Sequence, residues 1–273
     1  MRHDRGHHPL HTRWVASQLL RLDRTRPSTP GGDVEAERRL YRAIAGGVGI
    51  PVGRSSALAQ RTQVIDAEVA RALGRGTAQV VLLGAGGDGR GLRFGGGTVH
   101  WFEVDRPAAQ AQKRHRLEAL DIGTTSTTYI GLDLLADDLA IALAAAGHDA
   151  AAPSLFVAEE LFDVLTLEAT VSVCSALRAR AAPGSVLVAT FSIVPESGEL
   201  ARVVRSATGL LRQATDERRR NEFRPGDPHK LMVVTGWQVT HAETSAESRL
   251  DPGAHMLILV CEPDPDRGAL TGW

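Results

Sequence analysis

The chain has 273 residues with a formal net charge of −1 at pH 7, and 43% of the residues are hydrophobic. This length is enough to bury a full core in one large domain, and the near-zero charge gives no general attraction to nucleic acid or to an acidic membrane. No apolar run approaches the roughly 20 residues that span a bilayer, and no apolar signal-peptide segment follows the polar N-terminus, so we expect a soluble intracellular protein.

The first predicted elements are two helices. One covers 34–46, and the next begins at Ser55 or Ser56 and ends at Gly74. Apolar side chains recur at helical spacing along the second helix, and Arg61 lies on the same stripe. Because an arginine that faces the interior needs an anionic partner, the sequence predicts an acid next to Arg61.

Strands and helices alternate after the second helix. Continuous apolar runs predict strands at 79–83, 99–104, 153–160 and 185–191. Helical stretches separate them at 106–120, 137–147 and 167–181. Two closing strands are predicted at 236–243 and 255–262. Because such runs are typical of strands buried on both faces, the sequence predicts an α/β fold with an open, doubly wound, mostly parallel sheet.

The expected domain organisation is a single domain over 31–273 after a flexible polar tail at 1–30. The tail ends in the linker sequence RPSTPGGD, and its histidines lack the paired ligands of a metal site, so no metal is expected. Residues 192–230 interrupt the alternation with polar helical pieces, and we interpret them as a lid over the substrate.

A glycine-rich loop, GAGGDG at 84–89, follows the first strand and satisfies the pattern G-x-G-x-x-G. In doubly wound sheets such a loop approaches the cofactor, and an acid about 20 residues later binds a ribose hydroxyl. Glu103 and Asp105 meet that condition, which suits a dinucleotide and S-adenosylmethionine equally. Asp88 lies inside the turn and would repel a pyrophosphate, whereas S-adenosylmethionine carries no phosphate. Two arginines that follow the loop either meet phosphates or pair with neighbouring acids.

Four segments of the chain carry a shared pattern. They read LAQRTQVID, QVVLLGAGGDGRGLRF, VHWFEVDRPAAQAQKR and GLDLLADDLAIALAAAGHDAAAPSLFVAEELFDVLT. In combination they resemble the successive motifs of the leucine carboxyl methyltransferase family over about residues 38 to 191. That family includes protein phosphatase carboxyl methyltransferases and bacterial O-methyltransferases of polyketide and secondary-metabolite pathways. The resemblance implies a Rossmann-like class I methyltransferase fold with N-terminal helices.

The resemblance also implies S-adenosylmethionine as the cofactor. Arg61 would bind the methionine carboxylate of the cofactor, and Glu159 would receive its ammonium group. Gly84 and Gly86 would let the backbone approach the methionine portion. The alternative for Glu159 and its neighbour Glu160 is a solvated strand end.

The ribose and the adenine have their own implied partners. Asp105, with Glu103 as its neighbour, would hold the ribose hydroxyls. Asp133 and Leu134 would flank the adenine, with the carboxylate accepting a hydrogen bond from the exocyclic amine. The alternative for Asp133 is a cap on the helical stretch that follows.

The chain departs from the family pattern at three places. Gly89 stands where the family loop usually has threonine. Glu160 stands where the family usually has glycine, and Asp163 lies near the position of a missing tyrosine.

The leading hypothesis is an O-methyltransferase that acts on a carboxylate or a hydroxyl of a small molecule, with secondary-metabolite biosynthesis as the expected setting. In-line positioning supplies most of the catalysis, because the positive charge already activates the leaving thioether. A carboxylate acceptor needs no base, whereas a hydroxyl acceptor does, with His148, His229 and Asp163 as candidates. A structural role is favoured for His148.

Two further hypotheses keep the same fold. In one, the scaffold catalyses a non-methylating elimination or cyclisation, with Glu160 or Asp163 as general base. In the other, the chain is a binding or regulatory subunit that needs a partner. The expected partners are a small-molecule substrate and either a second copy or a partner subunit, with no nucleic acid and no membrane. Cys174 and Cys261 lie in apolar runs, so we expect buried free thiols and a cytoplasmic location.

Overall fold

The computed structural model describes residues 32–46, 56–124, 126–193, 221, 223–246 and 255–268. Its centre is a 7-stranded sheet with the order β3-β2-β1-β4-β5-β7-β6. The strands are β1 (Gln79–Leu83), β2 (His100–Asp105), β3 (Thr127–Gly131), β4 (Ser154–Ala158), β5 (Val186–Ile193), β6 (Trp237–Ala246) and β7 (His255–Pro263). The first five strands pair in parallel, and β7 runs antiparallel between β5 and β6.

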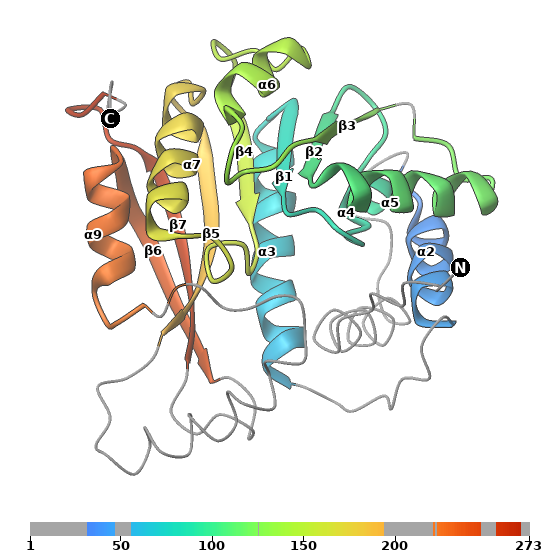
Figure 1. Cartoon of the computed structure of the whole chain (residues 1–273), viewed down its shortest axis with the longest axis horizontal. Coiled ribbons are helices and arrows are strands. Elements are labelled where there is room, and N and C mark those ends of the chain that lie inside the picture. The colour runs from blue at the N-terminus through green and yellow to red at the C-terminus, as the bar shows by residue number, and fades with distance from the viewer. Residues whose placement is uncertain are drawn as a thin grey trace.

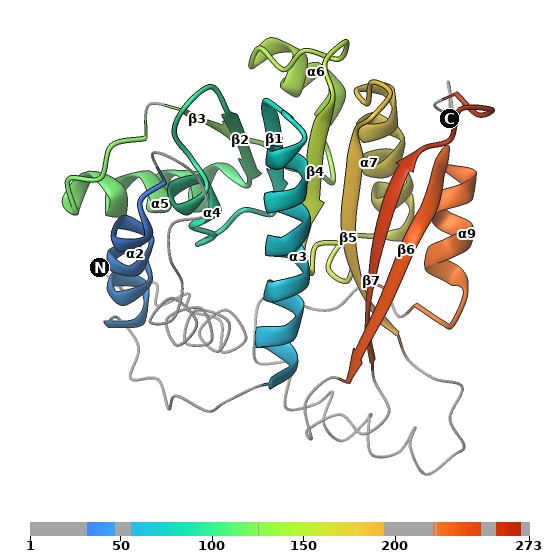
Figure 2. The same cartoon turned by 180° about the vertical axis from the view of Figure 1, so that it is seen from behind.

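Helices cover both faces of this sheet, so the predicted doubly wound α/β fold is confirmed (Figures 1 and 2). They are α2 (Val34–Gly46), α3 (Ser56–Gly74), α4 (Arg90–Arg93), α5 (Pro107–Ala119), α6 (Leu139–Ala145), α7 (Leu167–Ala179) and α9 (Asp227–Val234). In the two opposite views, α3 lies on one face of the sheet and α7 and α9 lie on the other.

The hydrophobic core is divided between the two faces. Val81 and Leu83 of β1 belong to the cluster that includes Val173 of α7, whereas Val80 and Leu82 belong to the cluster that includes side chains of α3. Successive side chains of a strand point to opposite faces, so a strand packed on both faces needs apolar residues at every position. This explains why the continuous apolar runs predicted the parallel strands.

One strand escaped the sequence prediction. β3 has the sequence TTYIG, and none of its residues is fully buried. It lies at the edge of the sheet beside β2, where one side of the strand lacks a partner among the described strands. An edge strand needs fewer apolar side chains, so β3 has no continuous apolar run that would predict it.

Several sequence predictions fall outside the described residues. The tail at 1–30 and the cap residue Ser55 belong there, as do 194–220 of the interpreted lid. The second helix begins at Ser56, and the predicted end at Gly74 is confirmed. In the part of the chain that the structure describes, no helix is long and apolar enough to cross a membrane. Both cysteines are buried and free, as predicted.

His148 lies near the amino ends of the parallel strands, because it precedes the first residue of β4. The glycine loop lies at their carboxyl ends, because it follows the last residue of β1. Its Nε2 lies 3.0 Å from the Ser154 hydroxyl, and its ring packs edge-on against Phe102. Burial and the nearby Arg180 lower the pKa of His148 to about 4. These contacts favour the structural role.

We expect the His148→Gln variant to lose less stability than the wild type as the pH falls from 6.5 to 4. The folded protein keeps His148 neutral down to about pH 4, whereas the unfolded chain takes up a proton below its ordinary pKa of 6.5. Acid therefore favours the unfolded wild-type chain over this range. Urea unfolding at several pH values measures the effect, and parallel pH profiles for the two proteins would contradict it.

Candidate cofactor and active site

Three strand ends bring the predicted cofactor residues together. Leu83 of β1 pairs in register with Val104 of β2 and with Ala158 of β4. The next residue along each strand is Gly84, Asp105 or Glu159, so these three lie side by side at the carboxyl edge of the sheet. This edge is where open α/β sheets bind their ligands.

The glycine loop turns sharply at this edge. Gly84 has a φ of 63° and Gly86 a φ of 41°, backbone values that residues other than glycine rarely adopt. The Gly86 amide donates a hydrogen bond to Asp105 Oδ2 at 2.6 Å. The ends of β1 and β2 are thereby tied together.

Five of the amides from Gly84 to Arg90 already have acceptors within the protein. The Ala85 amide donates to the Val104 carbonyl at 3.2 Å. Besides Gly86, the Asp88 amide donates to the Ala85 carbonyl at 2.6 Å, and the Gly89 amide donates to the Tyr41 hydroxyl at 3.0 Å. The Arg90 amide donates to Asp88 Oδ1 at 2.8 Å. A phosphate site at a glycine loop needs amides that point at the ligand, together with the start of a sustained helix. Here the amides are engaged and α4 has only 4 residues, so the geometry favours a cofactor without phosphate.

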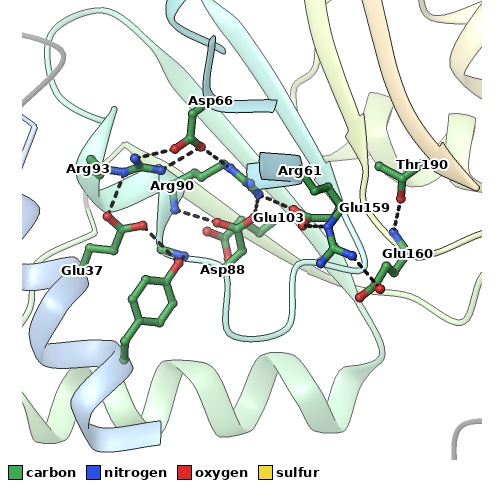
Figure 3. Close-up of polar contacts among 12 residues, drawn as sticks. Glu37, Arg61, Asp66, Asp88, Arg90, Arg93, Glu103, Glu159, Glu160 and Thr190 are labelled. Atoms are coloured by element: carbon green, nitrogen blue, oxygen red, sulfur yellow. Dashed lines mark hydrogen bonds and ion pairs between the residues drawn. The ribbon is translucent and has the colours of Figure 1, made fainter. Parts of the chain in front are cut away.

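The two arginines after the loop pair with acids, as one of the two sequence interpretations predicted. Arg90 lies 2.5 Å from Asp88, 2.9 Å from Asp66 and 2.8 Å from Glu159. Arg93 lies 2.7 Å from Asp66 and 2.8 Å from Glu37. Both arginine side chains are 1% exposed, and Figure 3 shows their guanidinium groups bridging acids of α2, α3 and the loop. They form a buried ion network beneath the loop.

Arg61 has the acidic partners that its place on a buried stripe predicted. Its Nε lies 2.7 Å from Glu159 Oε1, and its Nη1 lies 2.7 Å from Glu160 Oε1 (Figure 3). Burial lowers the pKa of Arg61, but Glu160 and Glu159 outweigh burial and hold that pKa above its ordinary value. Burial raises the pKa of Glu159, but Arg90 and Arg61 hold it below its ordinary value. Both groups are therefore charged at neutral pH.

Glu103 and Asp105 have different environments. Glu103 is 2% exposed and forms an ion pair with Lys113, whose ammonium also donates to the Asp88 carbonyl at 2.5 Å. Burial raises the pKa of Glu103 to about 6 against the opposing effect of Lys113. Asp105 is half-buried at the end of β2. Glu103 thus supports the loop indirectly, through Lys113. Asp105 is the acid that contacts the loop itself, through the Gly86 amide.

Asp133 and Leu134 follow β3, whose end is joined to β2 by the hydrogen bond from the Leu132 amide to the Asp105 carbonyl at 2.8 Å. Asp133 is exposed, and its Oδ1 accepts a hydrogen bond from the Leu135 amide at 3.0 Å. Leu134 is half-buried and packs against the core. Asp133 closes a local turn and still lies at the same edge as Asp105.

The three candidate catalytic residues are not gathered at one point. Glu160 contacts Arg61, while Asp163 is 3% exposed and accepts hydrogen bonds from the Ser192 amide at 3.1 Å and the Ser192 hydroxyl at 2.5 Å. His229 is exposed on α9, which packs against β6 at the far end of the sheet from β3. Only Glu160 lies beside the predicted cofactor residues.

The sequence analysis missed Lys113, whose ammonium donates to the Asp88 carbonyl, and two side chains of α2 that pack beside the glycine loop. Glu37 and Tyr41 lie on α2, and the Tyr41 hydroxyl lies 3.1 Å from Glu37 Oε1. Both are fully buried. A signal was present, because Glu37 falls on the helical stripe formed by Leu40, Tyr41 and Ile44, as Arg61 falls on the stripe of α3.

The departure at Gly89 has a steric cause. A Cβ atom added at Gly89 would lie 2.4 Å from Glu37 Cγ, far inside van der Waals contact. We expect Gly89→Thr to lower the free energy of unfolding by about 1–3 kcal/mol, the range for overpacking a core. Gly74→Ala is the matched control, because nothing lies within 4 Å of a Cβ added there. If thermal unfolding finds the two variants equally stable, the packing of α2 on the loop is wrong.

Comparisons with known proteins point to one family. A model of the leucine carboxyl methyltransferase family matches residues 15–178. A Frankia alni protein is 35% identical over 250 residues, which cover 89% of this chain and 79% of that one. A Streptomyces coelicolor protein is 30% identical over 247 residues, covering 89% and 80%. Both relatives are named provisionally as S-adenosyl-L-methionine-dependent methyltransferases.

Solved structures agree on the fold. The magnesium protoporphyrin IX methyltransferase of Synechocystis, solved with bound S-adenosylhomocysteine, matches 84% of this chain and 93% of its own, with a TM-score of 0.51 and 17% identity. A structure from Galdieria sulphuraria, provisionally named a sarcosine dimethylglycine methyltransferase, matches 84% of this chain and 99% of its own, with a TM-score of 0.54 and 12% identity. At these identities the matches show a class I methyltransferase fold and nothing about the substrate.

Proposed function

The chain belongs to the leucine carboxyl methyltransferase family, a family of S-adenosylmethionine-dependent methyltransferases, and from that premise we propose that it methylates a carboxylate or a hydroxyl of a small molecule in secondary-metabolite biosynthesis. The observation that carries the proposal is the meeting of Arg61, Glu159 and Asp105 around a loop whose amides are engaged. Arg61 offers a cation, Glu159 an anion, and Asp105 a hydrogen-bond acceptor for ribose hydroxyls. The loop offers no row of free amides for a phosphate.

The residues at this edge fit the proposed cofactor. Among the described residues, the buried Nη2 of Arg61 has no hydrogen-bond partner, which leaves a donor for the cofactor carboxylate. Glu159 would hold the ammonium group, and Asp105 the ribose hydroxyls. Asp133 and Leu134 would border the adenine, with Glu103 supporting the loop through Lys113. When bound, the cofactor supplies an electrophilic methyl group on a sulfonium.

The protein's own contribution is to orient the acceptor and to keep it near the strand ends. Orientation of this kind supplies much of the rate in a displacement whose leaving group is already activated. A carboxylate acceptor needs no proton transfer, whereas a hydroxyl acceptor needs a base. Of the candidate bases, His229 lies at the far end of the sheet and Asp163 is buried against Ser192, so the arrangement favours a carboxylate acceptor. We place the protein in the cytoplasm, where two buried free thiols stay reduced, and a second copy or a partner subunit remains a prediction.

Incubation with methyl-labelled S-adenosylmethionine and a set of small carboxylic acids, phenols and alcohols tests this function. Mass spectrometry should find one acceptor class that gains the labelled methyl group. A product that forms without label and without loss of the methyl donor would instead support the non-methylating reaction, with Glu160 or Asp163 transferring a proton.

A further inference from the structure

Glu160 has an unusual backbone conformation at the end of β4. Its φ is 54°, a left-handed value that it shares with only Asp121 among the non-glycine residues that the structure describes. The Glu160 amide donates to the Thr190 hydroxyl at 2.7 Å, which holds the strained turn in place (Figure 3). A strained residue that neighbouring groups hold in this way is often part of a functional site.

The strained turn directs the Glu160 carboxylate to Arg61. Glu160 Oε1 lies 2.7 Å from Arg61 Nη1, and Glu159 already occupies Arg61 Nε at 2.7 Å. One guanidinium group therefore faces two carboxylates. The third nitrogen, Nη2, is buried and makes no hydrogen bond to any described residue.

The two carboxylates are not equally fixed. Glu159 has an 11% exposed side chain and pairs with Arg90 at 2.8 Å as well as with Arg61. Glu160 has a 38% exposed side chain, and Arg61 is its only ion-pair partner among the described residues. Of the two, Glu160 is the carboxylate that can leave Arg61 at the smaller cost, because it is the more exposed and is not held by a second arginine among the described residues.

A ligand carboxylate binds an arginine best through two parallel hydrogen bonds. On Arg61 that pairing requires Nη2 together with Nη1, because Nε is held by Glu159. Glu160 already contacts Nη1, so a carboxylate that takes both nitrogens must either share Nη1 with Glu160 or displace it. In either case the Glu160 carboxylate would lie close enough to the ligand carboxylate to repel it.

We propose that Glu160 competes with the carboxylate of the cofactor for Arg61, and so weakens the binding of ligands that carry this carboxylate. Glu160 is thereby a residue that determines affinity and ligand preference at the cofactor site. The proposal rests on the proposed function, because it takes the ligand at Arg61 to be the methionine portion of S-adenosylmethionine or its product.

Calorimetric titration of the full chain with two ligands tests the proposal. S-Adenosylhomocysteine carries the amino-acid carboxylate, and 5′-methylthioadenosine shares its adenosine and thioether but lacks that group. Glu160→Gln removes the charge and keeps the side-chain length. We expect this variant to bind S-adenosylhomocysteine about fivefold more tightly than the wild type, the factor that a partly exposed ion pair supplies, with unchanged binding of methylthioadenosine.

Two further variants make the result specific. Glu160→Gly should also tighten the binding of S-adenosylhomocysteine, since it removes the same carboxylate and relieves the left-handed strain. Glu168→Gln is the matched control, because Glu168 is an exposed acid at the start of α7 that has no ion-pair partner among the described residues. It should leave both affinities unchanged.

Three results would overturn the proposal. Equal binding of S-adenosylhomocysteine by the wild type and Glu160→Gln would show that the carboxylate does not compete, and would leave the proposed function intact. Weaker binding by Glu160→Gln would show that Glu160 holds the ammonium group instead. If S-adenosylhomocysteine binds neither the wild type nor the two Glu160 variants, the proposed function fails together with this inference.

Discussion

Arg90→Ala is expected to lower the free energy of unfolding by about 3–5 kcal/mol, the cost of removing one partner from a buried ion network. Arg90 is 1% exposed and contacts Asp66, Asp88 and Glu159. Alanine would leave the Asp88 carboxylate without an ion-pair partner among the described residues, and it would weaken the pairing of the other two acids. Urea unfolding at pH 7 measures the loss.

The control is Arg71→Ala, the same substitution at an arginine on the protein surface. Arg71 has a 54% exposed side chain and pairs only with Glu68 among the described residues. Exposed pairs contribute about 0–1 kcal/mol, so this variant should unfold almost like the wild type. A loss for Arg90→Ala no larger than that for Arg71→Ala would contradict the buried network.

The pH dependence gives the Arg90 prediction a second readout. Because Arg90 and Arg61 lower the pKa of Glu159, this acid stabilises the wild type fully above its ordinary pKa of 4.5. That stability is lost as the pH falls through the lowered pKa of the folded state. Since Arg90→Ala removes part of this stability, the gap between variant and wild type should narrow as the pH falls below 4.5.

Arg61→Ala is expected to weaken the binding of S-adenosylhomocysteine by about 1.5–3 kcal/mol, or roughly 10- to 150-fold, the range for a hydrogen bond to a charged group. Arg61 is 2% exposed, and its Nη2 is the donor that no described residue uses. Calorimetric titration measures the affinity. Methylthioadenosine is the control ligand, because it lacks the carboxylate that Arg61 would bind.

The two ligands together separate a binding effect from an unfolding effect. Arg61→Ala should retain most of its affinity for methylthioadenosine if the protein stays folded. Equal losses for both ligands would indicate a distorted loop, and unchanged affinity for S-adenosylhomocysteine would remove Arg61 from the cofactor site.

Much of the fold was predictable because both faces of the sheet are covered. A strand between two layers of helices needs apolar residues at each position, so its run of apolar residues is easy to recognise. β3 lacks that run, because it lies at the edge of the sheet and is only half-buried. The doubly wound class did not depend on this strand.

The candidate site was predictable where a residue broke a local pattern. Arg61 on an apolar helix stripe required an acid, and Glu159 and Glu160 supply it. Glu37 broke the stripe of α2 in the same way and was missed. Which acid meets which arginine was not predictable, because Asp66, Asp88 and Glu159 come from three separate segments and meet only after the sheet has formed.

The left-handed backbone conformation of Glu160 also could not be predicted from the sequence. The family resemblance marked the position as unusual, but a substitution for glycine does not reveal where the new side chain points. The hydrogen bond to Thr190 and the pairing with Arg61 come from β5 and α3, which are distant in sequence. Only the assembled edge of the sheet shows that the carboxylate occupies the arginine.

The most direct test of the central claim is a calorimetric titration of the wild-type protein with S-adenosylhomocysteine and, separately, with NAD. The engaged amides of the glycine loop and the Asp88 carboxylate leave no cradle for a pyrophosphate, so S-adenosylhomocysteine should bind saturably at one site and NAD should not bind. Saturable binding of NAD with no binding of S-adenosylhomocysteine would contradict the account.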